Sequence, residues 1–179
     1  TVKNIGYKAF ENCKNLNNIT IPSSVSFIDA KAFDNTKYYN TSKHWYKGQL
    51  YVANCVVDSK TKIKSANLKS GTRLIAKEAY YNRKNLKSVK LSNKLQYIND
   101  RAFLNCNKVK SAVLPKSIKY VGKKAIGYKI TTVYADVDSF LEYYQKMILA
   151  RDDFTLYVYK NTAGNRYAKG NVFNYKVIK

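Results

Sequence analysis

Residues 5–22 read Ile-Gly-Tyr-Lys-Ala-Phe-Glu-Asn-Cys-Lys-Asn-Leu-Asn-Asn-Ile-Thr-Ile-Pro, and this stretch decides the fold because its pattern recurs along the chain. It begins with a block in which Ile or Val stands four residues before Ala and five before a large apolar residue. The same block returns at residues 28–33, 75–80, 98–103 and 121–126. Three of the steps are 23 residues long, and the fourth, 75 − 28 = 47, is two periods plus one residue. A fixed period indicates a repeat architecture, with one degenerate copy in the long step.

A second block follows each first block after a short loop. Its apolar residues have the spacing L-x-x-L-x-L at 16–21, 63–68, 86–91 and 109–114, and a shortened copy closes the series at 130–135. Alternation of this kind is typical of a strand with one buried face. One coil of about 23 residues cannot bury its own apolar face, so the coils must stack. We therefore expect a solenoid over residues 1–135, with parallel strands on one side of each coil and a second extended side.

Residues 5–22 closely resemble the consensus of the BspA-like leucine-rich repeats, and the resemblance covers roughly residues 1–135. Ala-Phe, Asn-Cys, Leu and Ile-Pro fall at the spacings of that family, whereas Thr36 and Arg83 stand where other coils have Cys13 and Cys106. The resemblance implies an α/β leucine-rich-repeat solenoid dominated by β-structure. It also implies a secreted or cell-surface protein, mostly bacterial, that serves adhesion or recognition rather than chemistry.

The inventory of reactive side chains is small. The chain holds one His, three Cys and one Met, no Cys or His lies at zinc-ligand spacing, and no glycine-rich phosphate loop occurs. We therefore expect no catalytic residue, no cofactor and no metal. No run of 18 apolar residues occurs, so the sequence predicts no membrane-spanning segment.

The cysteines are not expected to form a disulfide. Cys13 and Cys106 are equivalent residues four coils apart, which corresponds to roughly 19 Å at the ~4.8 Å spacing of neighbouring strands. A disulfide requires Cα atoms within about 7 Å. Cys55 lies in the degenerate segment, at least one rung from either partner. We interpret the thiols as small buried residues that turn the loops inward.

Positive charge dominates, with 33 Lys+Arg against 11 Asp+Glu and a net charge of +22. Lys64, Lys87 and Lys110 follow the first apolar residue of three successive strand blocks, and Lys90 lies between the last two apolar residues of one block. Stacking would place these four residues, here called the lysine ladder, on one exposed face. Like charges one rung apart repel by roughly 1 kcal/mol per pair at high dielectric, and a polyanion would relieve this repulsion. Solubility alone is the simpler interpretation of the charge.

Residues 37–51 break the period and contain the single Trp and the single His of the chain. Lys47 and Gly48 follow Trp45 and Tyr46 and precede an apolar run, which predicts a hairpin. Trp45 and Tyr46 are candidate contacts for sugar rings or protein. We favour the alternative that the rings of this insertion pack over the irregular coil and seal its core.

A second aromatic set recurs one residue before the Ile or Val of three first blocks. Its members are Phe27, Tyr97 and Tyr120. They are candidate aromatic contacts if they face solvent, or they close the lateral packing between coils. The sequence leaves both interpretations open.

The repeat is lost after residue 135. Apolar residues of 139–151 share one helical face, residues 154–159 alternate as in a strand, 163–169 form a short helical pattern before Gly170, and 172–178 read as a last strand. We expect residues 136–179 to form the small α/β cap that a solenoid end requires. Thr1 and Val2 fall inside a coil, so we expect the natural protein to extend upstream.

These features favour a non-catalytic adhesion or recognition module, secreted or on a bacterial surface. Its expected partners are host or bacterial surface proteins, or anionic glycans and teichoic acid. One alternative is a basic scaffold segment attached to the anionic wall of its own cell. A nucleic-acid-binding protein fits the charge but shows no nucleic-acid motif and ranks below both.

Overall fold

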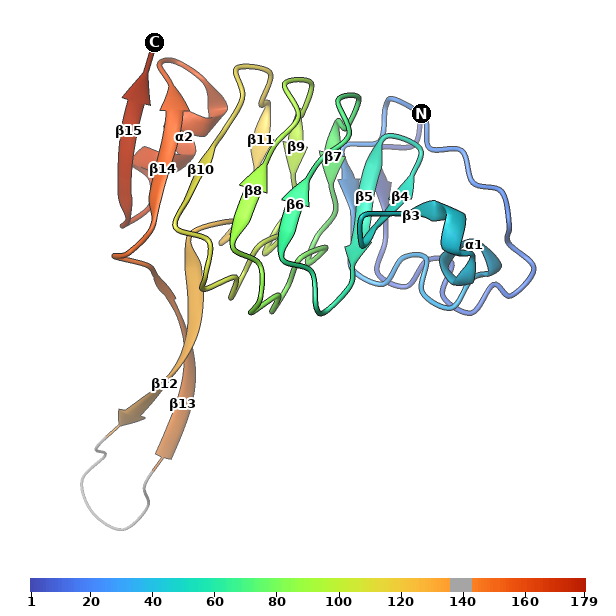
Figure 1. Ribbon diagram of the computed structural model, residues 1–179, viewed down its shortest axis with the longest axis horizontal. Coiled ribbons are helices and arrows are strands. Elements are labelled where there is room, and N and C mark those ends of the chain that lie inside the picture. The colour runs from blue at the N-terminus through green and yellow to red at the C-terminus, as the bar shows by residue number, and fades with distance from the viewer. Residues whose placement is uncertain (136–142) are drawn as a thin grey trace.

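The computed structural model describes residues 1–135 and 143–179 and shows a β-solenoid of about seven turns (Figure 1). Strands lie on two sides of the stack, and most of the remaining chain forms the turns between them. The predicted stack of parallel coils is confirmed. We call the side that carries β6, β8 and β10 the ladder face, because the lysine ladder follows it.

Short parallel strands form the ladder face. They are β6 (Ser65–Asn67), β8 (Ser88–Lys90), β10 (Ser111–Val113), β14 (Thr155–Tyr159) and β15 (Asn174–Ile178). β6 pairs with β8 with Ala66 opposite Val89, and β10 pairs with β14 with Ala112 opposite Leu156. In β6, β8 and β10 the central residue is the most buried of the three, as the alternation predicted.

The opposite side is a six-stranded sheet in the order β11-β9-β7-β5-β4-β3. Its regular members are β7 (Leu74–Ile75), β9 (Tyr97–Ile98) and β11 (Tyr120–Val121), all parallel, and β5 (Cys55–Ser59) pairs in parallel with β7. Ile75 and Ile98 lie opposite each other and are fully buried. The first-block residues Ile75, Ile98 and Val121 therefore lie in register on adjacent strands.

The Ala-aromatic pairs build the turns between the two sides. Tyr80 stacks on Phe103 with ring centroids 4.6 Å apart, and Phe10 stacks on Phe33 at 5.5 Å. The asparagines that follow adopt positive φ and are bonded between coils. The amide of Asn105 donates to the side-chain carbonyl of Asn82 at 2.8 Å. The amide of Asn35 donates to Asn12 in the same way at 3.1 Å, and the side-chain carbonyl of Asn105 also accepts the backbone N–H of Ile130 at 3.3 Å.

The third coil departs from the repeat. α1 (Lys37–Asn40) and a 3-10 turn (Ser42–His44) lead into an antiparallel hairpin of β3 (Trp45–Tyr46) and β4 (Gln49–Val52), and β4 also pairs with β5. The hairpin predicted around Lys47 and Gly48 is confirmed. Thr36 occupies a cysteine position of the repeat because its hydroxyl caps α1, accepting the N–H of Tyr39 at 2.9 Å.

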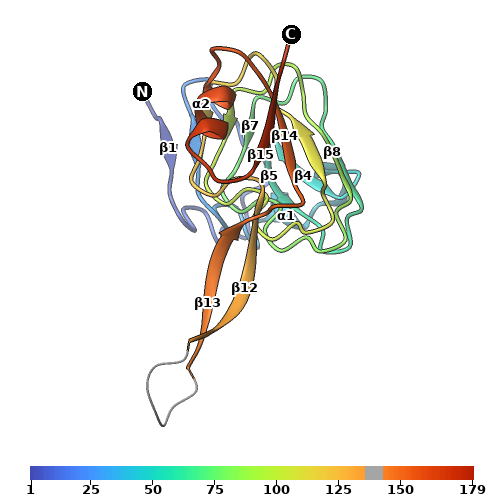
Figure 2. The same ribbon diagram turned by 90° about the vertical axis from the view of Figure 1, so that its left-hand side faces the viewer.

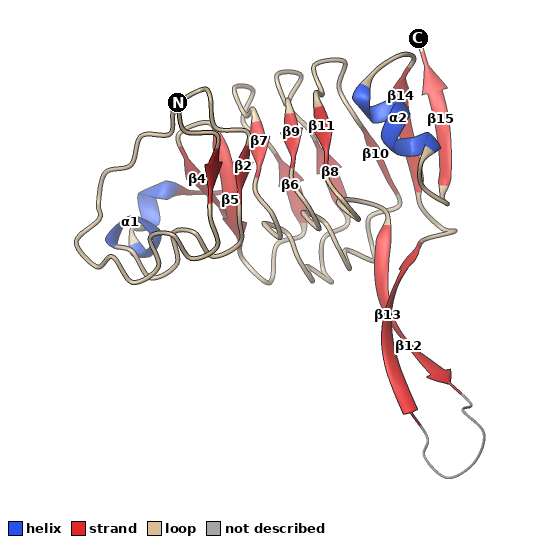
Figure 3. Ribbon diagram, turned by 180° about the vertical axis from the view of Figure 1, so that it is seen from behind, coloured by secondary structure: helices blue, strands red, loops and turns tan. Residues whose placement is uncertain are grey.

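The first two coils pair with each other through β1 (Asn4–Ile5) and β2 (Phe27–Ile28). β2 lies beside β5 and β7 (Figure 3), where the N–H of Lys77 donates to the carbonyl of Ile28 at 2.9 Å. The strand predicted at 16–21 does not form. The next coil offers no strand there, because the N–H of Tyr38, in α1, takes the carbonyl of Leu16 instead.

A long hairpin projects from the stack, formed by β12 (Tyr128–Ala135) and β13 (Tyr143–Ala150) (Figures 1 and 2). The prediction of a helix over 139–151 is therefore wrong for residues 143–150, and residues 139–142 lie outside the described residues. All eight residues of β13 pair with residues of β12, which contains a β-branched run. This non-local pairing overrides the helical pattern. The shortened repeat strand at 130–135 is likewise part of this hairpin.

The stack continues after the hairpin. In the fifth coil, 14 residues separate Ile98 from Ala112. In the sixth coil, 35 residues separate Val121 from Leu156, which is the partner of Ala112. The sixth coil is therefore 21 residues longer than the fifth. The solenoid thus extends past residue 135 through β14. β14, α2 (Ala163–Lys169) and β15 lie close to the predicted 154–159, 163–169 and 172–178, and α2 begins at the capping residue Thr162.

Candidate functional site

The lysine ladder lies along one edge of the ladder face. Lys64, Lys87, Lys90 and Lys110 are all exposed. The N–H of Lys87 donates to the carbonyl of Lys64 at 2.8 Å, which fixes these two residues one rung apart. Lys90 lies on β8, opposite Asn67 on β6. The coils thus bring the four predicted residues to one side of the molecule.

The strands carry two rows along this edge, and sequence reasoning missed the first row and the C-terminal end of the second. One row carries hydroxyl and amide groups and consists of Ser65, Ser88, Ser111, Thr155 and Asn174. The other contains Lys90 and ends in Lys176, which is exposed on β15. Ammonium groups beside hydroxyl donors suit an anionic ligand. Both rows consist of the residues that flank the paired inner residue of each strand. The sequence contains this pattern, but it becomes complete only when β14 and β15 are counted as further rungs.

One lysine of the ladder is neutralised. The ammonium of Lys110 donates to Asp153 at 2.6 Å, and the same carboxylate accepts from Arg151 at 2.9 Å. The guanidinium of Arg151 is buried and also donates to the carbonyls of Val109 at 2.8 Å and Cys106 at 3.0 Å. Arg151 thereby provides hydrogen-bond donors for backbone carbonyls in the turn of the neighbouring coil. Hydrogen bonds from Arg151 and Lys110 hold the pKa of Asp153 below its ordinary value.

The aromatic residues of the insertion pack against one another. Trp45 meets Tyr39 edge to face at 5.3 Å and donates its indole N–H to the Tyr39 carbonyl at 2.8 Å. The ammonium of Lys60 lies 4.4 Å from the centre of the Trp45 ring, and Tyr46 is 36% exposed. This arrangement favours the sealing role for Trp45. The Tyr46 ring is partly covered by the ammonium groups of Lys69 and Lys47, 4.9 and 5.4 Å from its centre.

Phe27, Tyr97 and Tyr120 line one groove together with Asn4 and Ser26. Tyr97 and Tyr120 are neighbours because β9 pairs with β11, and Phe27 arrives from β2, seventy residues earlier in the chain. Tyr120 is 44% exposed and the other two rings are half-buried. The three rings therefore border an open groove, which is the arrangement expected of aromatic contacts that face solvent.

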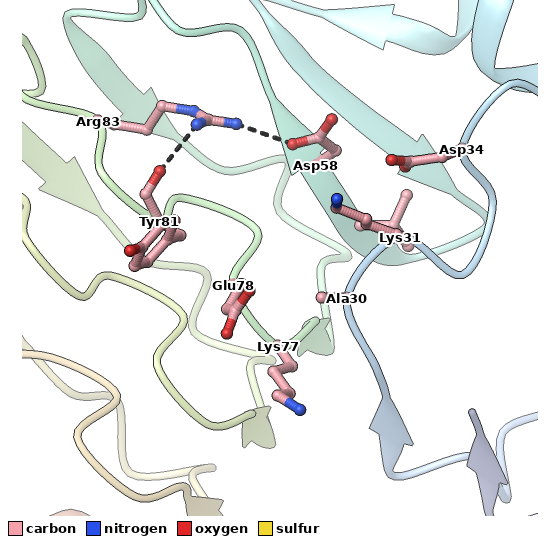
Figure 4. Close-up of a pocket in the computed structure, with 9 residues that line it drawn as sticks. Ala30, Lys31, Asp34, Asp58, Lys77, Glu78, Tyr81 and Arg83 are labelled. Carbon is pink, nitrogen blue, oxygen red and sulfur yellow. Dashed lines mark hydrogen bonds and ion pairs between the residues drawn. The ribbon is translucent and has the colours of Figure 1, made fainter. Parts of the chain in front are cut away.

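A polar cavity of about 220 Å³ marks the missing turn of the third coil (Figure 4). Arg83, which occupies a cysteine position of the repeat, donates to Asp58 at 2.9 Å and to the carbonyl of Tyr81 at 2.8 Å. The hydroxyl of Tyr39 also donates to Asp58 at 2.9 Å. Burial raises the pKa of Asp58 despite these donors. Arg83 and its partners occupy the place where the third coil has no turn. The hydrogen bonds around this cavity therefore connect the N-terminal coils to the rest of the stack.

All three cysteines are free thiols. Cys55 and Cys106 are buried, and the thiol of Cys106 donates to the carbonyl of Tyr80 at 3.0 Å. Burial raises the pKa of Cys55 to about 11 and that of Cys106 to about 12. Cys13 is exposed, since its coil is the first of the stack, which differs from the expected burial of every thiol.

Within residues 1–135 and 143–179, no three His, Cys, Asp or Glu side chains gather in a way that could hold a metal ion. No helix in the same part of the chain is long and apolar enough to cross a membrane.

The comparisons with known proteins agree with the stacked coils. The family model described as a BspA type leucine-rich repeat region (6 copies) matches residues 1–44. No curated protein and no solved structure matches the chain. Leucine-rich repeat proteins are typically non-catalytic, serve as protein-interaction or adhesion modules, and in the BspA-like family are typically secreted or at the surface. The repeats of this chain therefore carry the pattern of BspA-type leucine-rich repeats, and the family model matches them over residues 1–44.

Proposed function

We propose that this protein is a non-catalytic adhesion or recognition module, secreted or displayed on a bacterial surface, whose ladder face binds anionic glycans such as teichoic acid or sulfated polysaccharide. The observation that carries the proposal is the alignment of Lys64, Lys87 and Lys90 beside the half-buried Ser65 and the exposed Ser88 on successive rungs. Lys176 extends the same face. A repeating polyanion matches a repeating row of cations, because each rung offers the same donors at one spacing.

The distribution of carboxylates supports this choice of face. The chain has 11 Asp+Glu, and the ladder-face strands β6, β8, β10, β14 and β15 contain none. Asp152 and Asp153, which precede β14, are the acidic residues nearest in sequence to these strands. A polyanion that approaches the face over β6 and β8 thus meets ammonium and hydroxyl groups without a carboxylate from the strands.

Attachment to the wall of the producing cell is the second candidate, favoured by the same charge. The two functions differ in their dependence on salt, because a purely electrostatic contact with the wall weakens as the Debye length falls from ~8 Å at 0.15 M to ~3 Å at 1 M. A recognition module that also uses fitted hydroxyl contacts keeps selectivity among anions of equal charge density.

Binding to immobilised teichoic acid, heparin and polyglutamate at 0.15 M and 1 M salt tests the proposal. We expect the chain to bind the glycans more tightly than polyglutamate at 0.15 M salt. Equal binding to all three polyanions, lost together at 1 M salt, would favour simple wall attachment. Tight binding to duplex DNA that heparin does not displace would instead support a nucleic-acid function.

A further inference from the structure

The groove lined by Phe27, Tyr97 and Tyr120 lies apart from the ladder face. It has a volume of about 470 Å³, within the range of small-molecule sites. Its rings come from β2, β9 and β11, strands on the side of the solenoid opposite β6, β8 and β10 (Figures 1 and 3). A ligand of the groove and a ligand of the ladder face would therefore not compete.

The side chain of Asn99 builds this groove. Its carbonyl accepts the N–H of Ile28 at 3.0 Å, and its amide donates to the carbonyl of Ser26 at 3.0 Å. These two bonds hold the residues on either side of Phe27 against β9. Phe27 thereby stands beside Tyr97, although no strand pairing joins β2 to β9.

The lining of the groove carries no charge. None of its five residues is ionised at neutral pH, in a chain with 33 Lys+Arg. The nearest charged partner of a lining residue is Asp100, whose carboxylate accepts from the hydroxyl of Tyr120 at 3.3 Å. An anion would gain nothing from these residues and would meet a carboxylate at one end. The groove is therefore suited to a neutral ligand.

We propose that this groove binds a neutral oligosaccharide. The C–H faces of a sugar ring pack on exposed aromatic rings, as other flat apolar surfaces do. The amide of Asn4 and the hydroxyl of Ser26 lie at the same groove and provide hydrogen-bond donors and acceptors for sugar hydroxyls. Rings presented by successive strands β9 and β11 offer repeated stacking positions to a linear chain of sugars.

The test is titration of the whole chain with cellohexaose, chitohexaose and maltohexaose, monitored by calorimetry and amide NMR. We expect at least one of these saccharides to bind, with shifts at Phe27, Tyr97 and Tyr120. Tyr97→Ala and Tyr120→Ala should each weaken that binding roughly tenfold, because each removes one stacking surface. Tyr175→Ala is the matched control, since Tyr175 is 38% exposed on β15, away from the groove.

Two comparisons separate this proposal from the proposed function. Saccharide binding should be the same at 0.15 M and 1 M salt and should survive replacement of the lysine ladder. Absence of binding to all three saccharides would overturn the proposal, as would binding that the two tyrosine variants leave unchanged in their folded state. The proposal would also be overturned if a proline-rich peptide, but none of the saccharides, shifted the amide NMR signals of the groove. That result would assign the groove to a peptide.

Discussion

The side-chain carbonyl of Asn99 accepts a hydrogen bond from the backbone N–H of Ile28 at 3.0 Å, across 71 residues of sequence. Both residues are fully buried. The guanidinium of Arg73 reinforces the same junction by donating to the carbonyl of Val25 at 2.6 Å. At this junction side chains thus supplement the backbone bond from Lys77 to Ile28, whereas backbone ladders pair the strands of the regular coils.

Replacement of Asn99 by Ala should destabilise the protein by about 1–3 kcal/mol, because it leaves the buried N–H of Ile28 without an acceptor. Urea unfolding of this variant and of Asn93→Ala provides the measurement. Asn93 is exposed, so its replacement should change the free energy of unfolding by less than about 0.5 kcal/mol. Equal stability of the two variants would show that the junction does not depend on Asn99.

Shortening of the projecting hairpin should leave the solenoid intact. Replacing residues 131–147 by Asn-Gly keeps the first three pairs, from Tyr128 opposite Ala150 to Ile130 opposite Ile148, and closes them with a two-residue turn. Tyr128 keeps its edge contact with Phe173 at 5.9 Å. We expect a melting temperature within a few degrees of the parent, measured by circular dichroism. A variant that fails to fold would mean that the hairpin belongs to the stack.

Asp153→Asn should lower stability by about 1 kcal/mol near neutral pH, since the buried guanidinium of Arg151 loses its counter-charge and the half-exposed carboxylate is partly screened. The folded pKa of Asp153 lies below its ordinary value of 3.8, so its contribution is complete above that value and is lost as pH falls through the folded pKa. The raised pKa of Asp58 acts in the opposite direction but equally in both proteins, so it cancels in the difference.

Urea unfolding at several pH values between about 2 and 7 measures this difference. Asp152→Asn is the control, because it removes the same charge from a residue that forms no ion pair among the described residues. A gap between the Asp153 and Asp152 variants that stays constant down to the lowest pH would contradict the role of the Asp153 carboxylate.

Thiol chemistry should distinguish the three cysteines. At pH 8 the exposed Cys13 should react with a disulfide reagent in seconds to minutes, whereas Cys55 and Cys106 should stay protected because they are buried and their pKa values are raised to about 11 and 12. We expect one rapidly reacting thiol in the native protein and three after unfolding in guanidinium. Two or three rapid thiols in the native protein would show that the coils around Tyr80 open readily.

The repeat itself could be predicted because its information is local and periodic. The first-block Ile and Val residues, the strand blocks from residue 63 to 114 and the hairpin around Gly48 lie where spacing placed them. The exposure of the lysine ladder follows from the same spacing. The departures at Thr36 and Arg83 were visible, but their roles were not, since each side chain bonds to a segment that exists only where the period breaks.

Non-local partners decided what the sequence could not. Residues 143–150 have apolar residues at helical spacing, yet pairing with Tyr128–Ala135 makes them a strand. Leu16 to Ile21 has strand spacing, yet α1 removes the neighbour that a strand requires. The aromatic groove depends on Asn99, whose bond to Ile28 spans 71 residues and leaves no periodic signal.

The central claim is that the face carrying the lysine ladder recognises polyanions by the placement of its charge. Replacing Lys64, Lys87, Lys90 and Lys110 by Ser should leave the melting temperature nearly unchanged, because exposed charges contribute little to stability. A control variant with the same net charge of 22 − 4 = +18 replaces exposed lysines next to the opposite sheet and in α2, namely Lys3, Lys119, Lys123 and Lys169.

The dissociation constants of both variants for teichoic acid at 0.15 M salt test this claim most directly. We expect the ladder variant to bind several-fold more weakly than the control variant, whose dissociation constant should stay close to that of the parent protein. Equal weakening in the two variants would contradict it, because only the total charge would then matter.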